Sequence, residues 1–339
     1  MKIIFWGTPK YAIPCLDSIH NSHHEILAVV TQPDRRRGRG KKLIPSAVKL
    51  RANELGIRTF SPFNIKSQKD IQSDLFELKA DLFFVVAFGQ ILPTEVLNQP
   101  PLGCWNSHAS ILPRWRGAAP IQWSVLKGDE YTGTAIMAME EGLDTGPVLA
   151  HNKVKIGRYE DASYLMDRLS KLSAKLTLEC LDKIEKVGIC DQKQRYKSLG
   201  LISQSEMNNE VTYARQITKS DYLVNWNEYS VSIHRKILGL YPNAYTIING
   251  KRLKLLLTYI INDDLHESNL SNYYEELIKL NHPIGKPGQI VAIKQDFGLI
   301  VSTADSNMLI SQAQIEGKKP TNGNSLIQQL NIKVGEFLG

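Results

Sequence analysis

The sequence predicts an α/β protein in which a doubly wound, mostly parallel sheet is followed by a small, OB-like β-barrel as C-terminal domain. In the first half of the chain, short apolar or β-branched runs alternate with helix-length segments. This alternation is typical of a parallel sheet that helices cover on both faces. The last third instead has short strand-like runs separated by turn residues, as in small barrels. The length of 339 residues agrees with two domains.

The first half supplies its strands and helices in alternation. Four apolar or β-branched runs predict buried strands at residues 2–5, 26–31, 57–60 and 82–88. Helix-length segments lie between them at residues 12–19, 46–55 and 68–78. The middle helix is bounded by Pro45 and Gly56, residue types that commonly mark helix ends. Because ligands of such folds bind beyond the carboxyl ends of the strands, we expect the functional site there.

The middle of the chain carries the predicted domain boundary. A further strand is predicted at residues 132–139, and a long amphipathic helix follows at residues 161–186. The chain then turns polar, and we interpret residues 191–207 as a linker. This interpretation gives a catalytic domain of residues 1–190 and a C-terminal domain of residues 208–339.

The C-terminal domain is predicted to be built mainly from short strands. Asn249–Gly250 stands between two strand-like runs within residues 244–257, which is a strong indication of a hairpin. Further strands are expected in the runs that begin at Gly288, Gly298 and Asn307, and one helix near residues 231–238.

Composition places the chain among folded globular proteins, with 42% hydrophobic and 22% charged residues. The opening MKIIFWGTP is too short an apolar run for a signal peptide, and the longest apolar run has a strand's length. The four cysteines are scattered without a CxxC pair, which disfavours a disulfide framework and a zinc site. We therefore expect a reducing, cytoplasmic setting.

Most of the net charge of +7 lies in one short segment. Residues 34–42 (DRRRGRGKK) hold six basic residues against one Asp. Such runs are usually solvated loops, but this one follows a strand at the rim predicted for the site. An arginine-rich, glycine-containing loop suits RNA phosphates. Its candidate RNA-binding residues are Arg35, Arg36, Arg37, Arg39, Lys41 and Lys42.

Three polar residues form the candidate catalytic group. Asn106 and His108 follow a strand-like piece and, being two residues apart, point to the same side of an extended chain. An amide donor beside a titratable imidazole suits stabilisation of an oxyanion and proton transfer. Asp144, in GLDTGPV, is the candidate carboxylate that orients the imidazole.

Other chemistries match the sequence less well. A Ser-His-Asp hydrolase would use Ser107 or Ser110, but the G-x-S-x-G elbow is absent and Ser107 points away from His108. A dinucleotide-binding dehydrogenase is disfavoured because FWGTPKYA has one glycine where the fingerprint needs three. The HNSHH run at residues 20–24 has no matching acidic or cysteine partner, so we interpret it as a solvated loop.

Together, the run from Asn106 to Pro113 and the GLDTGPV motif resemble the active-site pattern of the folate-dependent formyltransferases, whose catalytic domain is Rossmann-like. TQPDRRRGRGKKL, VVAFGQILP and LPRWRGAAPIQW are similar in particular to the members that formylate methionyl-tRNA. The resemblance covers most of residues 2–150, and more loosely the C-terminal half through GKPGQIV and EGKKP.

The resemblance implies that 10-formyltetrahydrofolate donates a formyl group to the α-amino group of methionine on initiator tRNA, for translation initiation. It implies Asn106, His108 and Asp144 as the catalytic residues, with no metal. The first two would donate to the oxyanion, and Asp144 would orient His108 and relay protons. By motif, the folate-binding residues are Ser110, Ile111, Leu112, Pro113, Gln90, Ile91 and Leu92.

The resemblance also implies that the basic segment inserts into the tRNA acceptor stem, with Arg39 carrying much of the effect. The C-terminal domain would be a second tRNA-contacting surface, and the enzyme a cytoplasmic monomer. Relatives commonly have Pro at the position of Arg36 and a small residue at that of Arg37, so this segment is expected to act more through charge.

Two alternative functions remain. The first is a formyltransferase for an amino-sugar nucleotide, which would not need the RRRGRGKK run. The second is a non-catalytic RNA-binding protein on the same fold, which the complete set of Asn106, His108 and Asp144 disfavours.

Overall fold

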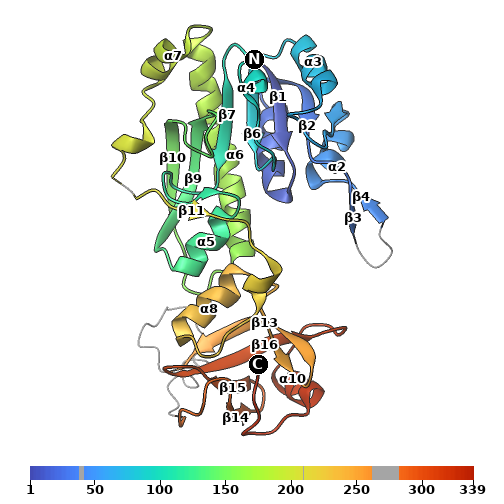
Figure 1. Ribbon diagram of the computed structural model, residues 1–339, viewed down its shortest axis with the longest axis vertical. Helices are drawn as coiled ribbons and strands as arrows, with labels where there is room; N and C mark the ends of the chain where they lie inside the picture. The colour runs from blue at the N-terminus through green and yellow to red at the C-terminus, as the bar shows by residue number, and fades with distance from the viewer. Residues whose placement is uncertain (38–41, 209, 262–281) are drawn as a thin grey trace. The chain divides into compact units, whose positions relative to one another are not determined.

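The computed structural model describes residues 1–37, 42–208, 210–261 and 282–339 (Figure 1). The chain divides into two compact units. Unit 1 comprises Met1–Pro120, Tyr131–Lys155 and Leu165–Gln216, and unit 2 comprises Ile121–Glu130, Ile156–Tyr164 and Ile217–Gly339. Residues 191–207, interpreted above as a linker, hold the helix α7 (Gln192–Leu199) and the 3-10 helix η2 (Gln204–Glu206), both in unit 1.

Unit 1 is built on a seven-stranded sheet with the order β10-β9-β7-β6-β1-β2-β5. Its strands are β1 (Lys2–Gly7), β2 (Glu25–Val30), β5 (Thr59–Phe60), β6 (Leu82–Val86), β7 (Cys104–His108), β9 (Tyr131–Ala138) and β10 (Val148–Lys155). The first five of these pair in parallel, whereas β9 and β10 pair antiparallel at one edge. The predicted mostly parallel sheet is therefore confirmed.

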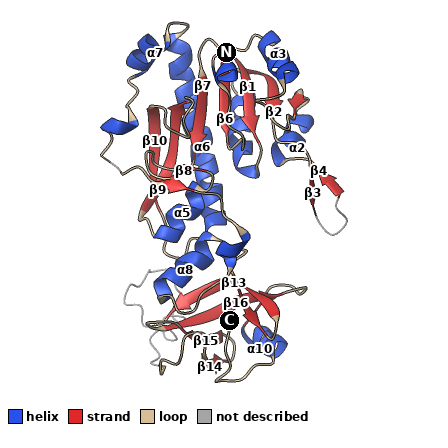
Figure 2. Cartoon of the chain, viewed as in Figure 1, coloured by secondary structure: helices blue, strands red, loops and turns tan. Residues whose placement is uncertain are grey.

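Helices cover both faces of this sheet (Figure 2). The helices of the first half are α1 (Ile13–His20), α2 (Ala47–Glu54), α3 (Lys69–Glu77) and α4 (Thr94–Leu97), and the long helix is α6 (Ala162–Val187). α1 and α6 lie on one face, where the Cys15 Sγ atom is 3.1 Å from the Ser173 Oγ atom. Residues of α3 and α4 belong to the core on the other face, which includes Trp6, Phe83 and Phe88.

The basic segment is flanked by two short strands instead of forming a loop throughout. β3 (Arg35–Arg37) pairs antiparallel with β4 (Lys42–Ile44). Figure 1 shows this ladder standing out from the rest of unit 1. Two of the predicted RNA-binding residues, Arg39 and Lys41, lie outside the described residues.

Unit 2 contains an antiparallel sheet with the order β12-β13-β16-β15-β14, and β17 pairs with β16. Its elements are β12 (Tyr245–Ile248), β13 (Lys251–Ile260), β14 (Ile290–Lys294), β15 (Gly298–Ser302), β16 (Asn307–Ile315), β17 (Thr321–Asn322), α8 (Ser230–Gly239) and α10 (Gly323–Leu330). The predicted hairpin joins β12 to β13, with φ of 48° at Asn249 and 72° at Gly250. Both values suit the turn that an Asn-Gly pair favours.

No helix in the described parts of the chain is both long enough and apolar enough to cross a bilayer.

Candidate active site

β7 delivers two of the three candidate catalytic residues. Asn106 and His108 are buried near the carboxyl end of this strand, with exposed fractions of 8% and 6%. Ser107, between them, points to the opposite face, where its Oγ atom is 2.5 Å from that of Ser173 on α6. Strand alternation thus separates Ser107 from the imidazole, as the sequence predicted. A Ser107–His108 nucleophilic pair is excluded by this geometry.

Asp144 reaches the same place from the connection between β9 and β10. Its Oδ1 atom accepts a hydrogen bond of 3.3 Å from Asn106 Nδ2, and its Oδ2 atom accepts one of 2.8 Å from the backbone N–H of Gly117. The Oδ2 atom also lies 3.6 Å from His108 Nδ1. The structure therefore brings the three predicted catalytic residues together.

A backbone carbonyl orients the imidazole. The His108 Nε2 atom lies 2.8 Å from the carbonyl oxygen of Trp115. Because a carbonyl only accepts hydrogen bonds, Nε2 carries the proton and donates. The other nitrogen, Nδ1, then faces Asp144.

Two features that hold Asp144 in place were not predicted from the sequence: the Gln204 side chain and the close approach of two chain segments at Gly117. The Gln204 side chain, on η2, donates 2.8 Å hydrogen bonds to the carbonyl oxygens of Asp144 and Gly146. Its Oε1 atom accepts two hydrogen bonds from the Arg116 guanidinium, at 3.0 and 2.8 Å. Gly117 has a φ of 114°, and a Cβ atom there would lie 2.9 Å from the Ala214 carbonyl oxygen. Periodicity gives no indication of such contacts between distant segments.

The residues after β7 that were predicted to bind folate are mostly enclosed. Ser110 donates a 2.6 Å hydrogen bond to the Arg114 carbonyl oxygen and is 1% exposed. Leu112 packs with Ala135, Met137 and Val148 in a small core. Pro113 is also buried, and Ile111 is partly exposed. Of the four side chains, that of Ile111 is the most accessible.

The three residues of FGQILP that were predicted to bind folate lie in different environments. Gln90 accepts a 2.8 Å hydrogen bond from the Ile65 N–H and donates one of 3.0 Å to the Pro62 carbonyl oxygen. Leu92 belongs to the sheet core, whereas Ile91 is 71% exposed. Gln90 therefore ties two connections together beside the site, and Ile91 presents an apolar surface.

A cavity of about 170 Å³ lies at the carboxyl ends of β1, β2 and β6. Its lining includes Thr8, Gln32, Ala87 and Gly89, together with Arg35 of β3. β6 also pairs with β7, so this cavity lies one strand away from Asn106. Through Arg35, the basic segment therefore borders the edge of the sheet where the functional site was predicted.

Basic side chains that the structure describes in the basic segment are exposed to solvent. Arg36 and Lys42 are exposed, and Asp34, the single acid of the segment, forms a 2.8 Å ion pair with Lys49 of α2.

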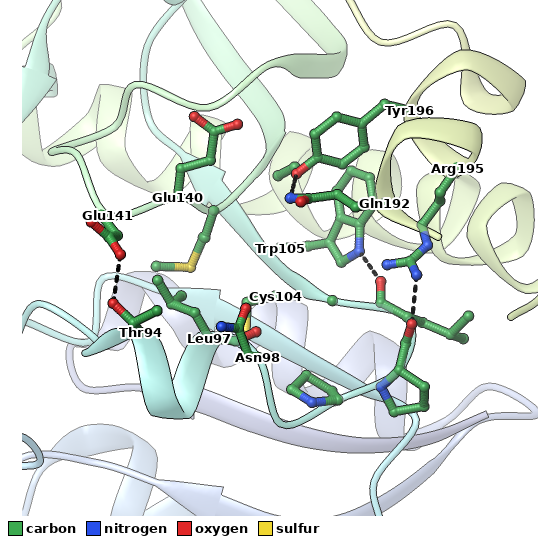
Figure 3. Close-up of a pocket in the computed structure, with 16 residues that line it drawn as sticks. Thr94, Leu97, Asn98, Cys104, Trp105, Glu140, Glu141, Gln192, Arg195 and Tyr196 are labelled. Carbon is green, nitrogen blue, oxygen red and sulfur yellow. Dashed lines mark hydrogen bonds between the residues drawn. The ribbon is translucent and has the colours of Figure 1, made fainter. Parts of the chain in front are cut away.

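A larger cavity, of about 480 Å³, lies between α7 and the start of β7 (Figure 3). It is lined by Trp105, Glu140 and Tyr196, and by none of the predicted site residues. Arg195, also in its lining, donates hydrogen bonds to the carbonyl oxygens of Pro101 and Cys190. This polar side chain supports the local fold, so we assign the chemistry to the opposite end of β7.

Comparison with known proteins agrees with this assignment. A family model described as formyl transferase matches residues 1–181, and one described as its C-terminal domain matches residues 216–331. A methionyl-tRNA formyltransferase of Prochlorococcus marinus (strain MIT 9303) is 50% identical over 99% of this chain and 98% of the relative. One of Synechococcus sp. (strain WH7803) is 50% identical over 100% of this chain and 98% of the relative.

Solved structures of low identity share the fold. An N-formyltransferase from Helicobacter canadensis, in complex with folinic acid and dTDP-3-aminofucose, has a TM-score of 0.61 at 16% identity, over 91% of this chain and 98% of its own. HypX from Aquifex aeolicus has a TM-score of 0.61 at 16% identity, over 99% of this chain and 48% of its own. With the matches at 50% identity, these comparisons show that the chain belongs to the formyl transferase family and, within it, to the methionyl-tRNA formyltransferases.

Proposed function

We propose that this chain transfers the formyl group of 10-formyltetrahydrofolate to the α-amino group of methionine on initiator tRNA. The convergence of Asn106, His108 and Asp144 at the carboxyl edge of the sheet is the observation that carries the proposal. Relatives that are 50% identical over nearly the whole chain are methionyl-tRNA formyltransferases, which supports this acceptor.

The reaction forms one C–N bond and breaks another. The amine nitrogen attacks the formyl carbon, and the carbonyl electrons move to oxygen, which becomes an oxyanion. When the carbonyl re-forms, the bond to the folate nitrogen breaks, and the proton lost by the amine is balanced by the proton that this nitrogen gains. Donors aimed at the oxyanion stabilise this path by roughly 3–4 kcal/mol each.

Asn106 and His108 are placed to be those donors. One N–H of the Asn106 amide is directed at Asp144, and we assign the second N–H of that amide to the oxyanion. The His108 Nε2–H is engaged by the Trp115 carbonyl oxygen, so the donor of this ring would be Nδ1–H. A hydrogen on Nδ1 as well as on Nε2 requires the imidazolium form of this ring, whose Nδ1 atom lies 3.6 Å from Asp144 Oδ2.

Asp144 would act as the local base. Its two carboxylate oxygens accept hydrogen bonds from Asn106 Nδ2 and from the Gly117 N–H. In this proposal the carboxylate accepts the proton of the attacking amine and passes it to the folate nitrogen that leaves. Orientation of the ring comes mainly from the Trp115 carbonyl, so the sequence-based role of Asp144 is refined to proton transfer.

The folate would lie along the residues predicted by motif, Ser110 to Pro113 and Gln90 to Leu92. The buried residues of this set would fix the backbone along one side of the folate site. The exposed Ile91 side chain offers an apolar surface to the pteridine. Positioning two large substrates together contributes up to roughly 7–11 kcal/mol to such a reaction. We expect the enzyme to act as a cytoplasmic monomer.

The tRNA would be held by the basic segment, residues 34–42, and by a surface of unit 2. In unit 2 a groove of about 530 Å³ is lined by Lys219, Arg252 and Lys254 and by Tyr222 and Tyr245. The Arg252 guanidinium lies 4.8 Å from the Tyr245 ring centre. Basic and aromatic side chains in one groove suit phosphates and unstacked bases. We assign residues 208–339 to this C-terminal tRNA-contacting role.

An acceptor assay tests the proposal. The full chain is incubated with 10-formyltetrahydrofolate and either methionyl initiator tRNA or an amino-sugar nucleotide, and the formylated product is measured. We expect product with the tRNA, and its loss in Asp144→Asn. Product with the sugar nucleotide alone would establish the rival enzyme, and tRNA binding without product from either acceptor would establish the non-catalytic reading.

A further inference from the structure

A cluster of four metal-ligating side chains lies on the α6 side of unit 1. His23 and His24 belong to the turn between α1 and β2, which was interpreted from the sequence as a solvated loop. The fold supplies two acidic partners, because Asp182 and Glu185 of α6 lie against this turn. They are three residues apart, so they share one face of the helix.

The ligand atoms are spaced as a single ion requires. One atom from each residue can be chosen so that all four lie within 4.8 Å of one another. The His24 Nε2 atom is 3.6 Å from Asp182 Oδ1, the His23 Nε2 atom is 3.9 Å from the same oxygen, and it is 2.8 Å from Glu185 Oε2. Bonds of about 2.0–2.1 Å to a tetrahedral ion place neighbouring ligand atoms about 3.4 Å apart. Bringing every pair of ligand atoms to this spacing requires the separations to shrink by at most about 1.4 Å.

The buried member of the cluster, His24, has an Nε2 atom without a hydrogen bond in the described part of the chain. The His24 side chain is 0% exposed, and among the described residues its Nε2 atom has no hydrogen-bond partner. Leaving a buried polar atom unpaired is destabilising, and a bound ion at Nε2 would relieve this. His23, Asp182 and Glu185 are 62%, 50% and 38% exposed, which leaves the cluster open to an ion from solvent.

The N-terminal amine also contacts two members of the cluster. The Met1 amine contacts Glu185 Oε1 at 2.9 Å and His24 Nδ1 at 3.3 Å.

We propose that His23, His24, Asp182 and Glu185 bind one divalent transition-metal ion, of which Zn²⁺ is the best match. Two imidazoles and two carboxylates suit Zn²⁺ or Co²⁺ and disfavour the all-oxygen coordination of Mg²⁺ and Ca²⁺. Each ring binds through Nε2 and carries its proton on Nδ1, so it stays neutral. The ion displaces the hydrogen bond between His23 and Glu185 and the contact of the Met1 amine with His24.

The role of the site is structural. Asp182 lies nine residues beyond Ser173, the residue of α6 that contacts β7, which is about 14 Å along the helix axis. An ion here cross-links the turn after α1 to the end of α6, and it stabilises the folded state because the ligands converge only in that state.

Calorimetric titration of the full, metal-free chain with Zn²⁺ tests the proposal. We expect one ion per chain, and at a free concentration of about 100 Kd a fall in the unfolding equilibrium constant of about 100-fold. Asp182→Asn and Glu185→Gln keep the side-chain shape and should each weaken binding by about 100-fold or more. Formyl transfer by these variants should match that of the unaltered chain.

Matched controls separate this site from other zinc-binding groups. His20→Ala removes an exposed histidine of the same region outside the cluster and should leave the affinity unchanged. Cys190→Ser removes the partly exposed thiol and should also leave it unchanged. Co²⁺ should give the visible absorption of tetrahedral nitrogen and oxygen coordination, without sulfur charge transfer. Absence of stoichiometric binding, or binding that survives His23→Ala/His24→Ala and is lost in Cys190→Ser, would overturn the proposal.

Discussion

Alternation along a single strand decides which side chains of β7 can meet a substrate. Asn106 and His108 face the carboxyl-edge site, while Ser107 is held against α6 by Ser173. The sequence was sufficient to predict this division, because side chains two apart in an extended chain share a side. It was not sufficient to predict that the Trp115 carbonyl holds the imidazole, since every residue has a carbonyl and only the path of the chain selects one.

A pair of neighbouring substitutions tests the division. We expect Asn106→Ala to lower kcat by about 100-fold or more, because it removes an oxyanion donor. Ser107→Ala should leave kcat near its original value and lower only the stability, since this hydroxyl meets Ser173 and not the substrate. Steady-state formylation with both variants measures the effect. A large fall of kcat in Ser107→Ala would contradict our reading of the strand.

At the scale of elements, the strands and helices with strong periodicity were predicted and confirmed. β6 and α6 are examples, since one is a fully buried apolar run and the other a long amphipathic helix. α7 was not predicted, because its sequence is polar and only Arg195 is buried. Its ends are stabilised instead by the Asp191 side chain, which accepts a hydrogen bond from the Gln194 N–H, and by Gly200 with a φ of 66°.

The β3–β4 ladder changes how the basic segment presents its charge. Arg36 and Leu43 are register partners, so the strands hold Arg36 and Lys42 at defined positions and not on a free loop. Cross-strand pairing reduces the conformational entropy that RNA binding would otherwise have to offset. This order was not predicted, since arginine runs have no strand-like alternation of polarity.

Neutralising two of these charges tests their contact with tRNA. In Arg36→Gln/Lys42→Gln we expect weaker tRNA binding and a log–log salt dependence that is shallower by about 1–2, with folate binding unchanged. The control variant Lys193→Gln/Lys197→Gln removes two exposed charges from α7. Binding titrations at several salt concentrations distinguish the two. Equal slopes for both double variants would rule out a specific role of the ladder.

For the whole molecule, the sequence was sufficient to predict a parallel α/β part followed by an antiparallel part. It did not show that residues 121–130 and 156–164 belong to unit 2, because such assignment depends on contacts between distant segments. In unit 2, Leu126 packs against the core around Ile233 and Ile237 of α8.

A buried histidine in unit 2 makes the stability of the protein depend on pH. Burial lowers the pKa of His234 to about 4 from its ordinary 6.5, and its Nδ1 atom is 3.0 Å from Thr258 Oγ1. Between these two pH values the unfolded chain binds a proton that the folded chain does not. The free energy of unfolding therefore falls as the pH drops through this window, by up to about 1.4 kcal/mol per pH unit from this group.

His234→Gln should remove this part of the acid dependence while costing some stability at neutral pH. Urea unfolding at pH 7, 6 and 5 measures the slope. His151→Gln alters an exposed histidine and should leave the slope as it is. If His234→Gln also leaves it unchanged, the ring is not the source of the acid sensitivity.

The Trp115 carbonyl has an evolutionary consequence. Every amino acid has a main-chain carbonyl oxygen. No single substitution at position 115 therefore removes the group that orients the His108 imidazole. At Gly117 only proline would delete the N–H that binds Asp144, but any other side chain would be strained by the φ of 114° and by the Ala214 carbonyl oxygen. Inactivating variation at these positions must therefore work by bending the chain. We therefore expect inactivating substitutions in this enzyme to fall mainly on distant side chains that fix the shape of the loop. Gln204, which donates to the carbonyl oxygens of Asp144 and Gly146, is an example.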